Sequence, residues 1–164
     1  AQDEGITRIG DDNWIMGYVH IAHDCQIGNK TILASNAQLA GHVHVQDWAI
    51  VGGMTGVHQF IKIGAHAMVG GGSALHKDVL PYVMISGNPS AVYGINSEGL
   101  KRRGFSPEQI MSIKRAYKMV FRQDLTIEQA IEAIEQAMQA DAANASAMRL
   151  MADFLRTAER GIVR

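Results

Sequence analysis

The chain has 164 residues, of which 47% are hydrophobic and 19% charged, so we expect one globular unit, or one large unit with an appendage. Its 15 basic and 16 acidic residues give a net charge of −1 without a basic run, which argues against a nucleic-acid partner. We also expect no membrane insertion and a cytoplasmic location, because there is no apolar stretch of roughly 18 residues, no signal-peptide pattern, and only one cysteine, Cys25.

Aliphatic residues recur at every sixth position in the first half of the chain. The twelve positions are Ile9, Ile15, Ile21, Ile27, Leu33, Leu39, Val45, Val51, Val57, Ile63, Val69 and Leu75. The residue that follows is mostly Gly or Ala. A period of six fits neither a helix nor the simple alternation of a strand. It predicts a parallel β-helix, in which short strands point their aliphatic side chains into a narrow core and small neighbours let the chain bend.

The hexads resemble those of the hexapeptide-repeat family, whose members wind three hexads into one triangular, left-handed coil. The resemblance implies a left-handed parallel β-helix with eighteen residues per coil. Coils stack about 4.8 Å apart, so residues eighteen apart lie above one another. Three neighbouring columns then contain most of the chemically active side chains: His23, Gly41 and Gln59; Asp24, His42, Phe60 and Asp78; and Ala22, Ala40, His58 and His76.

The histidines form the clearest candidate site. All seven lie between residues 20 and 76, and the columns predict that His23, His42 and His58 cluster on one face. A lone histidine on a solvated face is most simply a polar surface residue, but three together favour a function. His23 is followed directly by Asp24, and a carboxylate beside an imidazole orients the ring and stabilises its charged form. The pair therefore indicates a general base.

The C-terminal part is expected to be helical from about Ser97. Two helices have N-terminal capping signals, which are Ser106 with Pro107 and Gln109, and Thr126 with Gln129. A third helix is predicted to carry a buried stripe and to end at Gly161; the stripe is Met148, Leu150, Met151, Phe154 and Leu155. The prediction is a mainly β protein with an α-helical tail, divided into a β-helix over residues 1–96 and a helical domain over residues 97–164.

Several longer strings resemble one family closely. They are GYVHIAHDCQIGN, LAGHVHV, GGMTGVHQF, IGAHAMVGG and GINSEGLKRRGFS. They are similar to the UDP-N-acetylglucosamine O-acyltransferases that begin lipid A biosynthesis, and the resemblance covers the whole chain. It implies transfer of an (R)-3-hydroxyacyl chain from acyl carrier protein to the 3-hydroxyl of UDP-N-acetylglucosamine, without a cofactor or metal. It also implies a homotrimer with active sites between subunits.

The resemblance assigns roles residue by residue. It implies that His23 is the general base, that Asp24 orients it, and that the Gly41 backbone N–H forms the oxyanion hole. The residues that match sugar-nucleotide contacts are His20, His42, His58 and Gln59. Those that match uridine and diphosphate contacts are Asn96, Glu98, Arg102 and Arg103, and two arginines suit a diphosphate because guanidinium groups bind oxygens in pairs.

Two departures from the family pattern affect these expectations. Gly71 falls on a position that gauges acyl-chain length, and glycine would leave the groove open to a longer chain, but Pro89 stands where some members have a chain-limiting histidine. Members also begin several coils upstream and supply an active-site lysine from there. We therefore expect this chain to be the greater part of a longer enzyme, with doubtful activity as an isolated piece.

Two other functions remain open on the residues alone. A trimeric zinc carbonic anhydrase uses the same coil and binds metal through three histidines between subunits. In that case Asp24, Gln59 and the KRR turn have no evident role. The other alternative is a non-catalytic scaffold that binds carbohydrate, which predicts regular ladders of Thr, Asn or Ser instead of crowded His and Asp columns.

Overall fold

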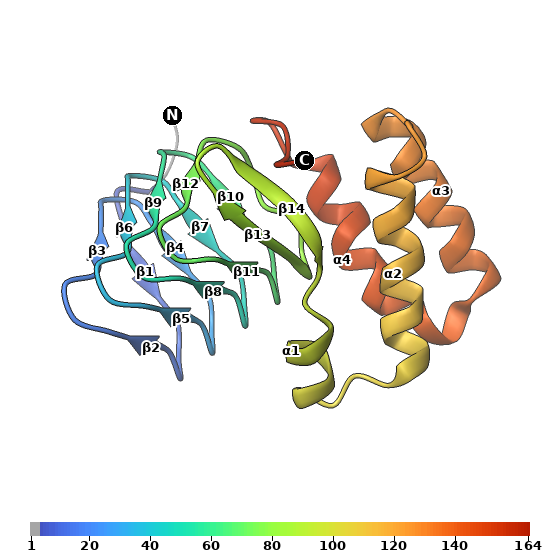
Figure 1. The fold of residues 1–164 in the computed structure, drawn as a ribbon, viewed down its shortest axis with the longest axis horizontal. Coiled ribbons are helices and arrows are strands. Elements are labelled where there is room, and N and C mark those ends of the chain that lie inside the picture. Colours follow the sequence, from blue (N-terminus) through green and yellow to red (C-terminus); the bar gives the residue numbers. More distant parts are fainter. Residues whose placement is uncertain (1–3) are drawn as a thin grey trace.

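The structure is a computed structural model that describes residues 4–164, so residues 1–3 of the predicted first domain lie outside the described residues. Twelve two-residue strands form about four turns of a parallel β-helix with three sheets (Figure 1). The first sheet contains β1 (Arg8–Ile9), β4 (Gln26–Ile27), β7 (His44–Val45) and β10 (Lys62–Ile63). The second begins with β2 (Trp14–Ile15), β5 (Ile32–Leu33), β8 (Ile50–Val51) and β11 (Met68–Val69). The third contains β3 (His20–Ile21), β6 (Gln38–Leu39), β9 (Gly56–Val57) and β12 (Ala74–Leu75).

The predicted eighteen-residue register is confirmed by the strand pairing. Gln26 lies beside His44, and His44 beside Lys62, in parallel strands. Leu33, Val51 and Val69 stack in the core with at most 1% of their surface exposed. Ile9 and Ile15 are 49% and 39% exposed, because they lie in the first described coil, at the open end of the β-helix.

The sequence predicts that the chain bends at the small residue after each aliphatic residue. The structure places the bends further along the chain. The turn occupies the second and third residues after the aliphatic residue, and the third has a left-handed backbone, as in Asp24 (φ 60°), His42 (φ 62°) and His66 (φ 61°). The small residue after the aliphatic serves coil stacking instead. A Cβ added to Gly52 would lie 2.5 Å from the backbone nitrogen of Gly71 in the next coil, so any larger residue would push the coils apart.

The β-helix ends in an antiparallel hairpin that the sequence did not predict. Strand β13 (Val83–Gly87) continues the second sheet and pairs with β14 (Ser90–Ile95). The helices that follow are α1 (Ser97–Arg102), α2 (Pro107–Phe121), α3 (Ile127–Ala140) and α4 (Ala145–Arg156), with a short 3₁₀ turn at Ala142–Asn144. The capping boxes at Ser106 and Thr126 are both present. Helix α4 ends at Arg156, so the expected end at Gly161 was wrong: the last residues leave the helix and return to the β-helix.

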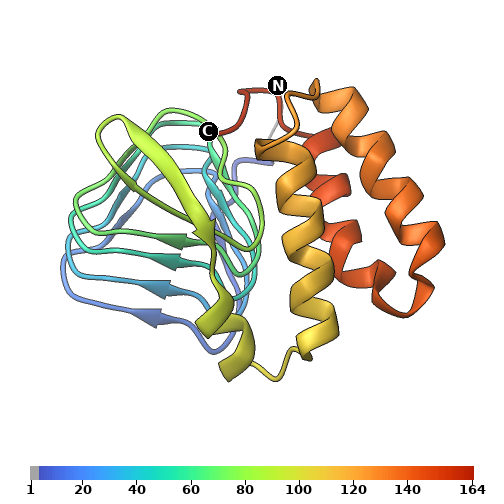
Figure 2. The same cartoon turned by 45° about the vertical axis from the view of Figure 1, so that its right-hand side comes forward.

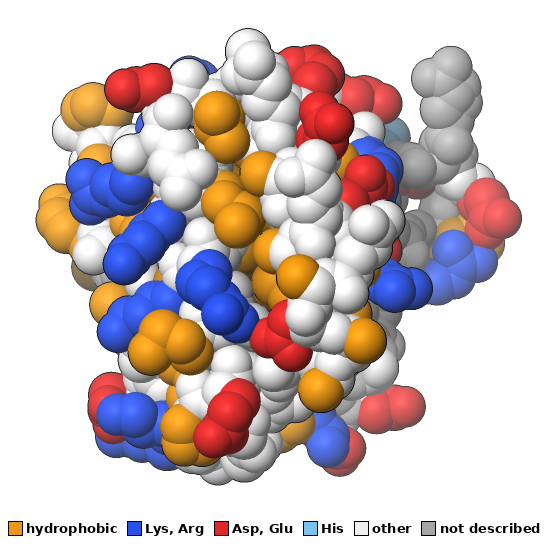
Figure 3. All heavy atoms as spheres, turned by 90° about the vertical axis from the view of Figure 1, so that its right-hand side faces the viewer, with side chains coloured by type: hydrophobic (Ala, Val, Ile, Leu, Met, Phe, Trp, Pro, Cys, Tyr) orange, Lys and Arg blue, Asp and Glu red, His pale blue; other side chains and the backbone are white. Residues whose placement is uncertain are grey.

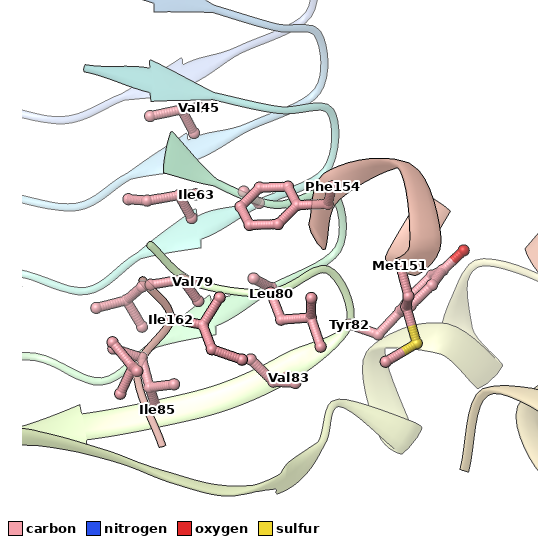
Figure 4. Close-up of a cluster of buried hydrophobic side chains, with 14 of the residues drawn as sticks. Val45, Ile63, Val79, Leu80, Tyr82, Val83, Ile85, Met151, Phe154 and Ile162 are labelled. Atoms are coloured by element: carbon pink, nitrogen blue, oxygen red, sulfur yellow. The ribbon is translucent and has the colours of Figure 1, made fainter. Parts of the chain in front are cut away.

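The helices pack against the C-terminal end of the β-helix (Figures 1 and 2). In Figure 4, Met151 and Phe154 of α4 lie beside Leu80 and Tyr82, and these residues belong to one continuous hydrophobic core. The Tyr82 hydroxyl donates a 2.8 Å hydrogen bond to the Ala147 carbonyl. Because this core crosses the proposed boundary, the division at residues 96 and 97 stays a prediction.

The C-terminal segment closes the last coil. Asp78 N–H donates to the Gly161 carbonyl, and Val163 N–H donates to the Asp78 carbonyl. Ile162 is buried against this coil (Figure 4). The outer face of the helices carries interspersed basic, acidic and apolar side chains (Figure 3), and none of the helices in residues 4–164 is long and apolar enough to cross a membrane.

Candidate active site

The predicted base and its carboxylate are hydrogen bonded at one corner of the β-helix. His23 and Asp24 are the two turn residues between β3 and β4, and His23 Nδ1 lies 2.8 Å from Asp24 Oδ2. The His23 side chain is 72% exposed, whereas that of Asp24 is 14% exposed. Asp24 has a left-handed backbone with φ 60°. When Nδ1 carries the proton and donates it to the carboxylate, Nε2 is free to accept a proton from a substrate.

Gly41 lies directly against that free nitrogen. A Cβ at residue 41 would be 2.6 Å from both Cε1 and Nε2 of His23. Any side chain at residue 41 would therefore displace the His23 ring from this position, a constraint that the sequence did not reveal. In the part of the chain that the structure describes, no hydrogen bond uses the Gly41 N–H as donor. Base and candidate oxyanion donor thus lie next to each other in adjacent coils.

His42 extends the corner by one coil. Its ring packs edge-on against His23, with centroids 5.1 Å apart, and stacks on Phe60 at 4.4 Å. Its Nε2 lies 3.8 Å from Asp24 Oδ2. His23, Asp24 and His42 offer ligand atoms within 4.8 Å of one another, so this group is the candidate cation site among the described residues. The same arrangement suits a hydrogen-bonded base whose carboxylate faces two imidazoles.

His58 does not join this group, so the predicted cluster of three histidines is divided. His58 pairs with His76 instead, with ring centroids 5.8 Å apart. Both line a groove of about 450 Å³ over the third sheet, together with His20. Gln59 is exposed beside His58, and its carbonyl lies 3.3 Å from His58 Nδ1. The groove and the His23 corner are neighbours, because His58 and Gln59 directly precede Phe60.

The residues predicted to bind uridine and diphosphate lie at a different corner. Asn96 is 4% exposed and caps α1: its side chain accepts a hydrogen bond from Gly99 N–H and donates one to the His66 carbonyl. Glu98 is exposed and pairs with Lys101 at 2.8 Å, and this lysine lowers the pKa of Glu98. Arg102 is exposed. Arg103 is half-buried and contacts His66 and Trp48. Strands β4 and β7 run between this corner and the His23 corner.

Gly71 lies at the third corner, next to Gly53 of the preceding coil. A Cβ at Gly71 would lie 3.2 Å from the Gly53 carbonyl oxygen. The neighbouring strand face carries an apolar groove lined by Met68, Met84 and Tyr93. The predicted site residues therefore lie at all three corners of the β-helix.

A second hollow beside the His23 corner is lined in part by two charged residues without a predicted role, Asp78 and Arg160. It has a volume of about 450 Å³ and is lined in part by His42, Phe60, Asp78 and Arg160. Asp78 is 1% exposed, its Oδ2 has no partner among the described residues, and burial raises its pKa. The columns had placed Asp78 below His42. Arg160, whose guanidinium lies 5.1 Å from the Phe60 centroid, arrives from the C-terminal segment and had no sequence signal.

The repeats place the chain in the hexapeptide-repeat class of parallel β-helix proteins. The family model described as bacterial transferase hexapeptide (six repeats) matches residues 6–41. A second family model, UDP-N-acetylglucosamine O-acyltransferase domain 2, matches residues 78–163, which is just over half of the 164 residues. The chain therefore belongs to the UDP-N-acetylglucosamine O-acyltransferase family.

Individual relatives agree with this assignment. The acyl-[acyl-carrier-protein]–UDP-N-acetylglucosamine O-acyltransferases of Verminephrobacter eiseniae and Burkholderia mallei are 57% and 52% identical over all 164 residues, which cover 63% of each relative. The crystal structure of the Moraxella catarrhalis UDP-N-acetylglucosamine O-acyltransferase matches with a TM-score of 0.92 and 42% identity, over 99% of this chain and 62% of that one. The chain thus spans a little under two thirds of the length of the relatives it matches.

Proposed function

We propose that this chain is the greater part of an acyltransferase that moves an (R)-3-hydroxyacyl chain from acyl carrier protein to the 3-hydroxyl of UDP-N-acetylglucosamine, the first step of lipid A biosynthesis. One observation carries the proposal: a His23–Asp24 pair whose free ring nitrogen lies against Gly41. A base beside a backbone N–H donor is the arrangement that acyl transfer to a hydroxyl needs.

The mechanism uses these three residues. His23 Nε2 removes the proton of the sugar 3-hydroxyl while that oxygen attacks the thioester carbonyl. The carbonyl oxygen becomes an oxyanion and accepts a hydrogen bond from the Gly41 N–H. The tetrahedral intermediate then collapses, the C–S bond breaks, and the thiolate of the carrier takes the proton from His23. Asp24 holds the ring in the required tautomer and stabilises its protonated form.

The other candidate residues form two binding regions. His20 and His58 line the groove next to His23, and Gln59 directly follows His58. All three are proposed to bind the sugar, together with His42 at the corner itself. Asn96 positions α1, so that Glu98 can contact the uridine and Arg102 and Arg103 can bind the diphosphate. The two regions lie at separate corners of one chain. This separation supports a homotrimer in which one nucleotide bridges neighbouring subunits.

The acyl chain is proposed to lie along the coils toward Gly71, whose lack of a side chain leaves room for a long hydroxyacyl group. No cofactor takes part in this mechanism. The proposal places the reaction in the cytoplasm, which agrees with a single, buried and unpaired Cys25.

The test uses the chain as it stands and the extended protein, meaning this chain together with the additional length that its relatives have. Both are incubated with UDP-N-acetylglucosamine and a series of 3-hydroxyacyl carrier proteins of increasing chain length. We expect the extended protein to form the 3-O-acylated product, fastest with a long donor. Failure of the extended protein to acylate this acceptor with any donor would refute the proposal. Stoichiometric zinc that is lost on changing His42 or His58 would favour the carbonic anhydrase alternative instead.

A further inference from the structure

His66 is a buried histidine at the α1 corner with no role in the mechanism above. It is 9% exposed and has a left-handed backbone with φ 61°. Its ring is stacked between Trp48 and Tyr82, with centroid distances of 6.2 and 5.6 Å, and Phe105 packs edge-on at 5.1 Å. The aromatic rings above and below leave the imidazole little freedom to rotate.

The imidazole forms a hydrogen bond with the Arg103 guanidinium. Arg103 NH1 lies 3.2 Å from His66 Nδ1. A guanidinium can only donate, so Nδ1 must be the acceptor and unprotonated. Burial, reinforced by the positive charge of Arg103 and opposed by Asp47, lowers the pKa of His66 from 6.5 to about 4, so the ring is neutral near pH 7.

Trp48 provides the second contact to the same guanidinium. Arg103 Cζ lies 5.2 Å from the indole centroid, within the range of a cation–π interaction. The hydrogen bond that the guanidinium donates to His66 and the ring face of Trp48 together fix both its position and its plane. Only one of its five N–H groups is used by His66, so the others remain available for a ligand.

The backbone of His66 also anchors the helix that carries these residues. Asn96 Nδ2 donates a 3.2 Å hydrogen bond to the His66 carbonyl, while Asn96 Oδ1 caps α1 through Gly99 N–H. His66 therefore contacts both the start of α1 and the arginine that follows its end.

We propose that His66 is a positioning residue for the nucleotide: its neutral ring holds the Arg103 guanidinium against Trp48, in the orientation that binds the diphosphate. This inference rests on the proposed function, because it takes the ligand of Arg103 to be the diphosphate of the acceptor. His66 touches no reacting atom. Its effect is on nucleotide affinity and not on the chemical step.

The test compares four forms of the extended protein: wild type, His66→Phe, Arg103→Met and the double variant. Phenylalanine keeps a flat ring between Trp48 and Tyr82 but removes the acceptor. We expect His66→Phe to raise KM for UDP-N-acetylglucosamine about tenfold, the size expected for one hydrogen bond to a charged group, and to change kcat less than about twofold. Because His66 acts through Arg103, the double variant should have the KM of Arg103→Met alone.

Lys30→Met is the matched control, because Lys30 Nζ lies 4.9 Å from the same indole centroid but has no recorded contact with His66 in the described part of the chain. In a variant that combines Lys30→Met with His66→Phe, the increase in KM should be the product of the two single increases, because the two residues act independently. An unchanged KM in His66→Phe would overturn the inference. So would a variant combining His66→Phe with Arg103→Met whose increase in KM is the product of the two single increases. A proportional loss of kcat with a lower melting temperature in His66→Phe would do the same, since it would indicate only a role in folding.

A measurement on Arg103 itself separates this inference from the proposed function. The order parameter of the Arg103 Nε–H bond, measured by ¹⁵N relaxation, should fall in His66→Phe and recover in part in His66→Gln, which restores an acceptor. If the extended protein neither binds nor acylates UDP-N-acetylglucosamine, the proposed function fails. A fall in the order parameter would then still support His66 as the residue that positions Arg103, whereas an unchanged value would overturn that role.

Discussion

Gly41→Ala tests whether the His23 ring depends on its glycine neighbour. The added Cβ would lie 2.6 Å from Cε1 and Nε2 of His23. Carbon contacts need about 3.5 Å, so the ring must move by roughly 1 Å. The His23 side chain is 72% exposed and can swing outward, so folding should be preserved. The base then leaves its position beside the oxyanion donor, and a displacement of about 1 Å lowers the rate about 100-fold.

The assay is kcat of acyl transfer by the extended protein, with thermal unfolding followed by circular dichroism. We expect kcat to fall about 100-fold with little change in melting temperature. Gly17→Ala is the control, because a Cβ there meets nothing within 4 Å and its backbone is not left-handed. A Gly41→Ala variant that keeps a rate within about threefold of wild type, well inside that expected loss, would refute the reasoning.

Three further predictions concern carboxylates and the buried histidine. Asp24→Asn should lower kcat about 100-fold with KM nearly unchanged, because the amide cannot stabilise a charged His23; a specific effect on KM alone would contradict this. Asp78→Asn should raise the melting temperature near neutral pH, and the gain should vanish in acid. Burial raises the pKa of Asp78, so its charged form destabilises the fold as pH increases, and an equal gain at all pH values would contradict this cause. His66 has a lowered pKa, so its contribution to stability is present above about pH 6.5 and is lost toward pH 4. His66 should therefore account for about 2 kcal/mol of the fall in wild-type stability between about pH 7.5 and pH 5, and this part of the fall should be absent in His66→Phe. Urea unfolding at each pH measures it, and parallel pH curves for the two proteins would contradict it.

The coil and its columns could be predicted because each hexad is a local pattern. One aliphatic position in six determines which side chains enter the core, and the eighteen-residue register comes from the family resemblance, which implies three hexads per coil. The same reasoning correctly placed Gly41 next to His23. It did not reveal that the ring of His23 fills the space next to Gly41. A column states which residues are stacked in successive coils, but not the direction in which a side chain points.

The parts that were missed depend on contacts between distant segments. The hairpin of β13 and β14 continues a sheet beyond the end of the hexads, so the six-residue repeat of aliphatic residues does not predict it. Helix α4 stops at Arg156 because the chain must return to pair with Asp78. His58 directly follows β9 and packs on His76 in the groove over the third sheet, whereas His42 is a turn residue with a left-handed backbone. The contact between His66 and Arg103 joins residues 37 apart, a distance that no local motif spans.

The most direct test of the central claim is single-turnover acyl transfer to UDP-N-acetylglucosamine by the extended protein with and without His23. The position of the acyl group is assigned by NMR spectroscopy of the product. We expect the wild type to acylate the 3-hydroxyl, and His23→Ala to be slower by about 1,000-fold while still folding, since its ring is mostly exposed. A His23→Ala rate within about tenfold of wild type, below the smallest loss expected for a general base, would contradict the account.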